Sequence, residues 1–302
     1  MRIAVTGRDG QVATALAEYG AAHGVEVVRV GRPALDLAAP ESVRAALAAV
    51  RPDVVVNAAA FTAVDLAESQ AQAAFAINAA GAGAVAEAAR ALEAPVIQLS
   101  TDYVFDGEKP APYHEDDATG PVSVYGASKL AGERAVAAAT EDHVILRTAW
   151  VYAASGKNFV RTMLRLAQER DAVRVVADQR GCPSYAPDIA AAVIAVARNL
   201  AAHPRDAALR GVFHLTGQGE ATWAQLAEEV FAQARAAGGK GAAVIPITTA
   251  EYPTPARRPR NSRLDGAKLA RVHGVVLPEW RQSLARCVAR IYDTERQGEP
   301  GA

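Results

Sequence analysis

The chain has 302 residues, of which 51% are hydrophobic and 22% are charged, a balance that is typical of a folded globular protein and excludes a disordered one. Its formal net charge of −1 argues against a nucleic-acid-binding protein, which usually presents a strongly basic face. The two cysteines, Cys182 and Cys287, stand far apart, which argues against a disulfide scaffold and favours a reducing compartment.

The amino-terminal segment MRIAVTG has one basic residue and a short apolar run that ends in a glycine turn. A signal peptide needs a longer apolar segment and a cleavage site, and the alanine-rich stretches further on are too short to span a bilayer. We therefore expect a cytoplasmic protein with no membrane partner and no nucleic-acid partner.

Short β-branched runs alternate with longer alanine-rich stretches through the first half of the chain. The predicted elements are strand 2–6, helix 11–23, strand 25–30, helix 41–50, strand 54–57, helix 72–92, strand 96–100, helix 124–140 and strand 143–147. The strands are apolar on both sides, as burial from both faces demands. This alternation predicts an α/β protein with a Rossmann-type, doubly wound parallel sheet that has helices on both faces.

The rhythm loosens after residue 150, where we predict a smaller C-terminal α/β lobe. Its predicted elements are helix 158–169, strand 173–177, helix 188–200 capped by Asp188, strand 212–216, helix 222–236 capped by Thr222, an irregular segment 251–263, helices 264–272 and 280–292, and a frayed tail 295–302. We assign residues 1–150 to the core and residues 151–302 mainly to the lobe, with the segments around 171–200 and 211–216 shared between them.

The first predicted strand runs into the segment Gly7-Arg8-Asp9-Gly10-Gln11-Val12-Ala13, which has the spacing G-x-x-G-x-x-A. The first glycine permits a tight turn, the second lets a pyrophosphate approach the backbone, and a small third residue lets helix and sheet pack closely. An ordinary strand-to-helix turn is the alternative. The context, after a strand and at the start of a helix, favours a dinucleotide site with contacts from Gly7, Gly10, Gln11 and Val12.

Residues after the second and third strands extend this candidate cofactor site. An acid at the end of the second strand would bind the ribose 2′-hydroxyl of NAD, but the chain has Gly31-Arg32 there. Arg32 could pair with the 2′-phosphate of NADPH, which favours NADPH over NADH as the cofactor; a solvated surface arginine is the alternative. Asp36 and Leu37 would flank the adenine, although Asp36 also suits a turn. The ribose and nicotinamide would lie against small residues, unless these serve packing alone: Ala58, Ala59 and Ala60.

The segment Tyr125-Gly126-Ala127-Ser128-Lys129 places a tyrosine and a lysine four residues apart on a predicted helix, so both side chains project from one face. An ammonium group beside a phenol stabilises the phenolate and brings its pKa towards the working range of a proton donor. The same lysine would hydrogen-bond the nicotinamide ribose. A surface pair is the alternative, because this spacing also arises by chance.

A hydroxyl group at the end of the fourth strand completes the candidate catalytic set. Ligands of such sheets bind outside the carboxyl ends of the strands, where the chain has Ser100-Thr101-Asp102. We predict that Thr101 hydrogen-bonds a substrate carbonyl, with Ser100 as the fallback and a capping or turn role as the alternative. Thr101 and Tyr125 would hold the carbonyl oxygen while hydride passes from a nicotinamide to the carbon, which predicts a ketone reductase.

At these motifs the sequence resembles the extended short-chain dehydrogenase/reductase superfamily, and in particular its dTDP-4-dehydrorhamnose reductase family. Seven segments spread over nearly the whole chain carry the similarity: the glycine turn with Gln11, NAAAFTAVDLAE (57–68), LSTDYVFDG (99–107), VYGASKLAGE (124–133), RTAWVY (147–152), DQRGCPS (178–184) and RRPRNSRLD (257–265). The resemblance implies NAD(P)H-dependent reduction of the C4 ketone of dTDP-4-dehydro-6-deoxy-L-mannose to dTDP-L-rhamnose. Thr101, Tyr125 and Lys129 would be the catalytic set.

The resemblance also implies contacts with a dTDP-sugar substrate, and it makes the smaller lobe the substrate-binding one. Apolar walls would come from Val64 and Trp150, although Trp150 could equally pack in the core. Asp102 would hydrogen-bond sugar hydroxyls. The remaining implied pocket residues are Tyr103 and Phe105, together with Gln179, Pro183 and the loop 257–263, including Arg257, which would approach the diphosphate.

The sequence departs from the family pattern near the substrate lobe. Ser184 stands where the family usually has threonine, and Cys182 occupies a variable position. A 4-ketoreductase for another dTDP-deoxysugar is therefore one alternative. A non-catalytic dinucleotide-binding subunit is another, although retention of the whole catalytic set argues against it. Some family members form magnesium-linked dimers, but no carboxylates match here, so Mg²⁺ is left unassigned and a homodimer is left open.

Overall fold

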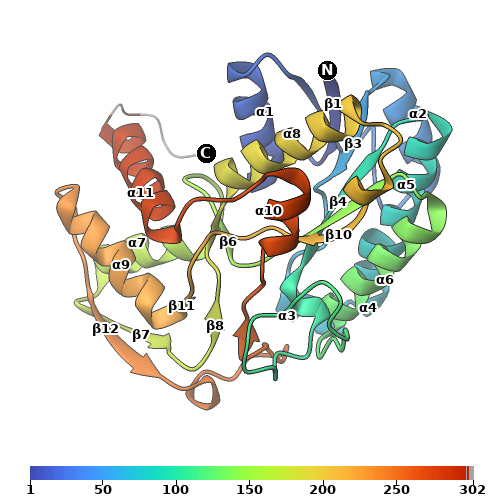
Figure 1. Ribbon diagram of the computed structural model, residues 1–302. Coiled ribbons are helices and arrows are strands. Elements are labelled where there is room, and N and C mark those ends of the chain that lie inside the picture. Colours follow the sequence, from blue (N-terminus) through green and yellow to red (C-terminus); the bar gives the residue numbers. More distant parts are fainter. Residues whose placement is uncertain (297, 299–302) are drawn as a thin grey trace.

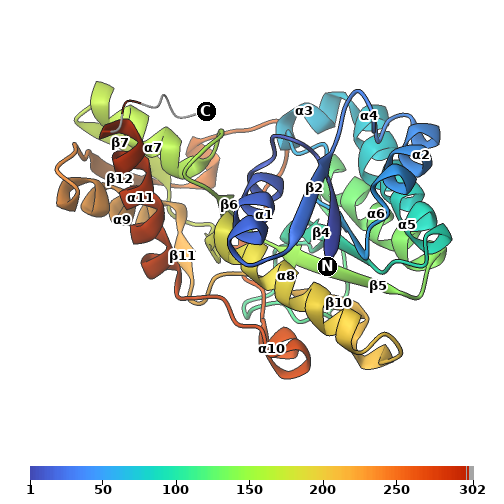
Figure 2. The same cartoon turned by 90° about the horizontal axis from the view of Figure 1, so that it is seen from above.

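The computed structural model describes residues 1–296 and residue 298. A large part built on one sheet stands beside a smaller lobe, which carries α7 (Phe159–Glu169), α9 (Trp223–Ala236) and α11 (Trp280–Arg296) (Figures 1 and 2). Among the described residues, no helix is both long enough and apolar enough to cross a membrane.

A six-stranded parallel sheet forms the centre of the large part, with the strand order β10-β5-β4-β3-β1-β2. Its strands are β1 (Arg2–Thr6), β2 (Glu26–Val30), β3 (Val54–Asn57), β4 (Val96–Thr101), β5 (His143–Thr148) and β10 (Gly211–His214). The register pairs Thr6 with Asn57, so the carboxyl ends of β1 and β3 meet at one edge. The strand order reverses between these two strands, and such a switch point is where ligands bind in α/β sheets.

Helices cover both faces of the sheet because its strands are apolar on both sides (Figure 2). Ile3 and Val5 of β1 pack with α1 (Gln11–Ala22) and α8 (Ala186–Ala202) on one face. Ala4 lies between them and packs with the other cluster, which includes α2 (Pro40–Val50), α5 (Gly81–Ala91) and α6 (Val124–Ala139). This alternation follows the two-residue period of a strand, and the predicted doubly wound sheet is confirmed.

The smaller lobe has a core of its own, in which Trp280, Phe231 and Tyr152 are fully buried. Its longer strands, β7 (Ala172–Val176) and β12 (Ala243–Ile247), pair in parallel. Two-residue strands border the lobe: β6 (Val151–Tyr152) pairs with β9 (Ser184–Tyr185), and β8 (Arg180–Gly181) lies between β11 (Ala221–Thr222) and β13 (Asn261–Ser262). α10 (Ala267–His273) packs back on the large part, where Leu269 joins the cluster that contains Phe213 of β10.

The segment predicted as one helix over 72–92 is divided in the structure. α3 (Val64–Ser69) and α4 (Ala71–Phe75) precede a π-helical turn, η1 (Ala76–Ala80), and α5 begins only after it. Alanine and glycine dominate this stretch, so its apolar period carries little information about where a helix is interrupted. Turns of this kind occur frequently at functional sites.

Several other predicted boundaries shift as well. Asp188, predicted as a cap, lies inside α8, because the helix already begins at Ala186. Its carboxylate accepts hydrogen bonds from Ser283 and Arg286.

Thr222 caps α9 as predicted, through a capping box. The segment 251–263, predicted to be irregular, contains the short strand β13. Two residues are too few for the sequence to show the alternation by which a strand is predicted. The described residues also contain three short 3-10 turns: η2 (Asp102–Val104), η3 (Ala207–Leu209) and η4 (Thr249–Glu251).

The predicted frayed tail is corrected at its beginning. α11 continues through Glu295 and Arg296, which the sequence places in the tail. Residues 297 and 299–302 lie outside the described residues.

A buried ion pair ties α6 to β5. Glu133 accepts hydrogen bonds from Arg147 at 2.9 and 2.7 Å and from the Ser100 hydroxyl at 2.5 Å. The side chains of Glu133 and Arg147 are each only 5% exposed. Removing one partner of such a pair leaves an uncompensated buried charge, which typically costs about 3–5 kcal/mol.

We expect Arg147→Met to lower the free energy of unfolding by about 3–5 kcal/mol, because Glu133 would remain buried without its cation. Urea unfolding followed by circular dichroism measures this difference. The matched control is Arg165→Met, which breaks an exposed pair with Glu169 and should cost less than about 1 kcal/mol. A loss for Arg147→Met no larger than that of the control would contradict the expectation.

Candidate active site

The turn between β1 and α1 leaves open space for an anion. Gly7 has φ = 96°, a left-handed conformation that favours glycine. A Cβ atom placed on Gly10 would meet no other atom within 4 Å, and no side chain caps the helix that follows. The first N–H groups of α1 and the positive end of its dipole therefore face this space, which fits the pyrophosphate of a dinucleotide.

A cavity of about 400 Å³ lies beside this turn, at the carboxyl ends of β1 and β2. It brings together six of the predicted cofactor residues: Gly7, Arg32, Asp36, Leu37, Ala59 and Ala60. Asp36 also accepts a hydrogen bond from the N–H of Ala38 at 3.0 Å, so it makes the alternative turn contact as well. The cavity is thus a second observation, independent of the glycine spacing, that fits a dinucleotide.

Arg8 also lines this cavity, although the sequence analysis does not single it out. Its side chain lies over Gly31, where an added Cβ atom would stand 2.8 Å from Arg8 Cγ. Its carbonyl accepts a hydrogen bond from Arg29 at 2.7 Å. The only signal in the sequence was a positive charge inside the glycine turn. Arg8 and Arg32 together give the cavity two cationic residues.

The crevice between β1 and β3 is fixed by buried hydrogen bonds. Thr6 Oγ1 donates to Asn57 Oδ1 at 2.6 Å and accepts from the N–H groups of Ala58 and Ala59. Asn57 Nδ2 in turn donates to Gln98 on β4 at 2.7 Å. These bonds hold the backbone of the predicted alanine segment at the switch point of the sheet.

Two of the predicted cofactor residues make other contacts. Gln11 Oε1 accepts a hydrogen bond from Asn158 Nδ2 at 3.1 Å, which links the start of α1 to the segment before α7. Val12 is half-buried and packs against the core beneath the sheet. Their predicted contacts with a dinucleotide remain predictions.

Tyr125 and Lys129 project from α6 towards the carboxyl end of β4. Lys129 Nζ donates to the carbonyl of Leu99 at 2.7 Å, and Lys129 is 5% exposed. The phenol of Tyr125 lies beside the Thr101 hydroxyl. Ser100, the fallback for Thr101, bonds Glu133 instead. The structure therefore brings the three predicted catalytic residues together and directs Ser100 elsewhere.

Burial determines the protonation of this cluster. Burial lowers the pKa of Lys129 to about 8, although the nearby Glu133 carboxylate acts in the opposite direction. It raises the pKa of the Tyr125 phenol well above its ordinary value, and the nearby Thr101 hydroxyl offsets only part of this effect, so the predicted shift of this pKa towards the working range is wrong for the protein without substrate. At neutral pH the phenol is therefore protonated and the lysine carries its positive charge.

Asn78 in the π-helical turn contacts α6, and no pattern in the sequence predicted a role for this residue. Its amide donates to Ser128 Oγ at 2.9 Å and bonds both backbone groups of Phe61. A Cβ atom on Gly132 would stand 2.0 Å from the Asn78 carbonyl, so α6 can lie this close only because residue 132 is glycine. The wider turn at η1 is what directs that carbonyl at the neighbouring helix.

Arg258 reaches the site from the loop between η4 and β13. Its guanidinium donates to the Tyr103 hydroxyl at 3.1 Å and to Asp65 of α3 at 2.7 Å. Tyr103 packs edge-on against the ring of Tyr125, with centroids 5.4 Å apart. The neighbouring Arg257 is exposed and pairs with Glu108. Within the described structure, Arg258 therefore lies closer to the catalytic cluster than the predicted Arg257.

Trp150 follows β5 in a strained left-handed conformation, with φ = 49°. Its indole stacks on Trp223, with centroids 3.5 Å apart, and a Cβ atom on Gly181 would stand 2.3 Å from it. Trp223 donates to the buried Gln179 at 3.1 Å. Two predicted substrate contacts therefore lie together at the lobe boundary: Trp150 stacks on Trp223, and Gln179 is hydrogen-bonded to Trp223. Trp150 also makes the packing contacts that were the alternative to a role in substrate binding.

The other predicted substrate residues differ in exposure. Val64 is half-buried at the start of α3. Phe105 is fully buried and stacks on Tyr113 with centroids 4.1 Å apart, which gives it a packing role. Pro183 is buried, and its carbonyl faces Gly217. The predicted sugar or nucleotide contacts of these residues remain predictions.

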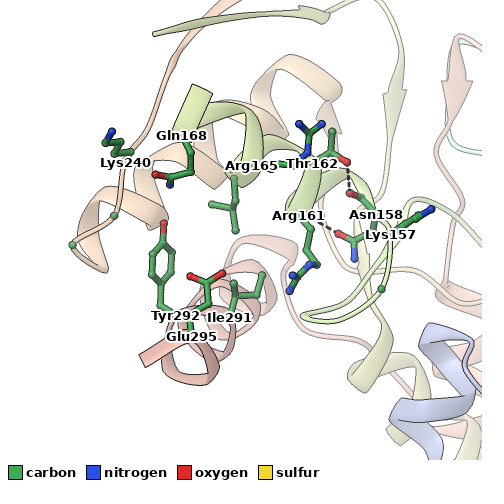
Figure 3. A pocket seen from close by; sticks show the side chains of 14 residues that line it. Lys157, Asn158, Arg161, Thr162, Arg165, Gln168, Lys240, Ile291, Tyr292 and Glu295 are labelled. Carbon is green, nitrogen blue, oxygen red and sulfur yellow. Dashed lines mark hydrogen bonds between the residues drawn. The ribbon is translucent and has the colours of Figure 1, made fainter. Parts of the chain in front are cut away.

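A separate cavity of about 940 Å³ lies in the smaller lobe between α7, α11 and the turn after α9 (Figure 3). Arg161, Gln168, Lys240 and Tyr292 are among its lining residues, and it shares no residue with the predicted site. Among the described residues, no group of three or more His, Cys, Asp or Glu side chains is arranged to hold a metal ion.

The switch-point crevice, the uncapped helix and the helical Tyr–Lys pair together define an extended short-chain dehydrogenase/reductase. The model of the RmlD substrate binding domain family matches residues 1–293. The chain belongs to this family, the dTDP-4-dehydrorhamnose reductases, which are NAD(P)H-dependent oxidoreductases.

Individual relatives resemble the chain over almost its whole length. A dTDP-4-dehydrorhamnose reductase of Sinorhizobium fredii is 54% identical over 288 residues, which cover 95% of this chain and 97% of that protein. The crystal structure of such a reductase from Clostridium acetobutylicum has a TM-score of 0.89 and 37% identity, over 96% of this chain and 99% of that one. The Bacillus anthracis enzyme, in complex with NADP, has a TM-score of 0.88 and 33% identity over the same shares.

We expect Gly10→Val to weaken dinucleotide binding by about tenfold or more, because the new side chain enters the space in front of α1. Folding should be nearly unaffected, since no atom lies within 4 Å of the added Cβ. Fluorescence titration with the reduced dinucleotide measures the affinity, and thermal unfolding measures the stability. Gly120→Ala is the control, since its Cβ would make only an ordinary contact of 3.6 Å with Asp106. Equal affinity in both variants would exclude this turn as the phosphate site.

Proposed function

We propose that this protein reduces the C4 ketone of dTDP-4-dehydro-L-rhamnose to dTDP-L-rhamnose with NADPH as the hydride source. The observation that carries the proposal is the meeting of Tyr125, Lys129 and Thr101 at the carboxyl end of β4, on the sheet edge that carries the glycine-lined crevice. Membership of the family supports the choice of sugar, since the relative that is 54% identical is named for that reaction.

Thr101 and Tyr125 hold the ketone oxygen in this mechanism. Two hydrogen bonds from these side chains meet the negative charge that grows on the oxygen as the carbon becomes tetrahedral. The Tyr125 phenol then gives its proton to that oxygen and becomes a phenolate. The bound nicotinamide dinucleotide supplies the hydride for the carbon.

Lys129 stabilises the phenolate that remains on Tyr125. The two residues are one helical turn apart, and the ammonium group is buried, so its charge acts through a medium of low dielectric constant. The hydrogen bond to the Leu99 carbonyl fixes the ammonium position. Because burial lowers the pKa of Lys129 to about 8, this support is present at neutral pH and is lost as the pH rises through that value.

The sugar nucleotide occupies the space between the catalytic cluster and the smaller lobe in this proposal. Val64, Tyr103 and Trp150 contact the sugar, and Gln179 and the loop 257–263 approach the diphosphate. The hydrogen bond from Arg258 to Tyr103 supports this assignment, because it brings a cation from that loop to the catalytic cluster.

NADPH is the preferred cofactor in this proposal because two arginines line the cavity at the end of β2. Arg8 and Arg32 can each give a charge-assisted hydrogen bond to a 2′-phosphate, a contact that NADH lacks. The preference is supported by the absence of an acid at this strand end, where NAD-binding proteins carry one.

We expect Tyr125→Phe to lower kcat by about 10²–10³-fold, because the ketone oxygen would lose a hydrogen bond and its proton donor. Loss of absorbance from the reduced cofactor measures turnover, and NMR of the isolated product distinguishes dTDP-L-rhamnose from its C4 epimer. Tyr252→Phe, at a residue that is 60% exposed, is the control. Unchanged turnover in Tyr125→Phe would remove the phenol from the mechanism, and the epimer as product would redirect the function to another deoxysugar.

We expect the double variant Arg8→Ser/Arg32→Ser to bind NADPH about 10²–10⁴-fold more weakly, since each of the two charge-assisted bonds is worth roughly 1.5–3 kcal/mol. Binding of NADH should change little. Calorimetric titration with both dinucleotides measures the ratio, and Arg90→Ser on α5 controls for the loss of surface charge. If the affinities for NADPH and for NADH fall by the same factor, the arginines do not bind the 2′-phosphate.

A further inference from the structure

Asp102 is a buried acid directly behind the catalytic hydroxyl. The residue is 3% exposed, and its Oδ1 lies 3.0 Å from Thr101 Oγ1. Thr101 Oγ1 also accepts the N–H of Tyr103 at 3.2 Å, and it lies beside the phenol of Tyr125. Asp102 is therefore hydrogen-bonded to Thr101, whose hydroxyl lies next to the Tyr125 phenol.

The surroundings of the second oxygen of Asp102 do not stabilise a negative charge. Asp102 Oδ2 is buried and has no hydrogen-bond partner among the residues that the structure describes. A buried ionised oxygen without a partner is far more costly than a buried neutral carbonyl oxygen. If Oδ1 carries a proton and donates it to Thr101, Oδ2 becomes such a carbonyl oxygen.

The surroundings of Asp102 favour the neutral form as well. Burial raises the pKa of Asp102 to about 6, and the hydroxyls of Ser262 and Thr101 offset part of this effect. The titratable groups that face it are Tyr103 on η2, Tyr125 on α6 and Cys182 in the loop after β8, and each is neutral at this pH. The charged Arg258 interacts with Tyr103, and its guanidinium is engaged by Asp65.

We propose that Asp102 in its protonated form is a positioning residue that directs the Thr101 hydroxyl at the substrate ketone. The proposal rests on the proposed function. An ionised Asp102 accepts the Thr101 proton, so the hydroxyl has none left for the ketone oxygen. A protonated Asp102 donates to Thr101 instead, and Thr101 then donates onward, which aligns both hydroxyl groups of the site with the oxygen that gains charge.

The direction of the pH effect follows from this switch. Thr101 donates to the substrate when Asp102 is protonated, so the rate of ketone reduction increases as the pH falls through about 6. Lys129 loses its proton only near pH 8, so the two transitions are separable. Asp102→Asn places an amide at this position that can donate to Thr101 but does not titrate.

The experiment compares kcat/KM between pH 5 and pH 7.5 for the parent protein, Asp102→Asn, Ser262→Ala and Asp106→Asn. We expect the transition near pH 6 to disappear in Asp102→Asn and to move to higher pH in Ser262→Ala, since the Ser262 hydroxyl lowers the pKa of Asp102. Asp106→Asn removes an exposed carboxylate that bonds Tyr113 outside the site, and it should retain the parent profile. A transition that persists in Asp102→Asn would overturn the proposal.

Infrared difference spectroscopy tests the same group without turnover. The carbonyl band of a protonated carboxylic acid should appear in the parent protein as the pH falls through about 6, and it should be missing in Asp102→Asn. Absence of that band in the parent protein at pH 5 would also overturn the proposal. A parent protein that shows the band but reduces no dTDP-sugar would instead count against the proposed function, so the two failures are distinguishable.

Discussion

The meeting of Tyr125, Lys129 and Thr101 depends on how closely α6 approaches the backbone around it. A Cβ atom on Gly126 would stand 2.1 Å from the carbonyl of Tyr103, and one on Gly132 would stand 2.0 Å from the carbonyl of Asn78. Two glycines therefore let the helix lie directly on η2 and on the π-helical turn. This approach brings Lys129 within 2.7 Å of the Leu99 carbonyl and places the phenol of Tyr125 beside Thr101.

The same close packing explains the charges that the protein buries near the site. Glu133 and Arg147 neutralise each other one turn beyond Lys129, and Ser100 occupies a further bonding position of the carboxylate. Lys129 retains only a backbone carbonyl as its direct partner, and Asp102 retains an oxygen with none among the described residues. The paired ions hold the helix in place, whereas burial moves the pKa of Lys129 down to about 8 and that of Asp102 up to about 6.

The sequence predicts the sheet well because its strands are short apolar runs set off by turns. It also predicts that Tyr125 and Lys129 lie together, because they share one helical face, while their catalytic roles remain predictions. The π-helical turn and Asn78 were not predictable from an alanine-rich segment whose apolar period is nearly featureless. Arg258 could not be distinguished from Arg257, because an irregular loop has no repeating pattern of buried and exposed residues from which the direction of a side chain could be predicted. Arg8 was missed for the same reason, because its position over Gly31 depends on the tertiary approach of two turns.

The route of the chain between its two parts limits how the smaller lobe can be replaced. After β6 the chain enters the smaller lobe, returns with α8 and β10, leaves again with α9 and β12, comes back with α10 and ends in the lobe with α11 (Figure 1). Neither part is a continuous stretch, so replacing one segment of the chain does not replace the whole smaller lobe. Substitutions in the loops between the two parts can alter the surface of the smaller lobe while the sheet and its crevice stay unchanged.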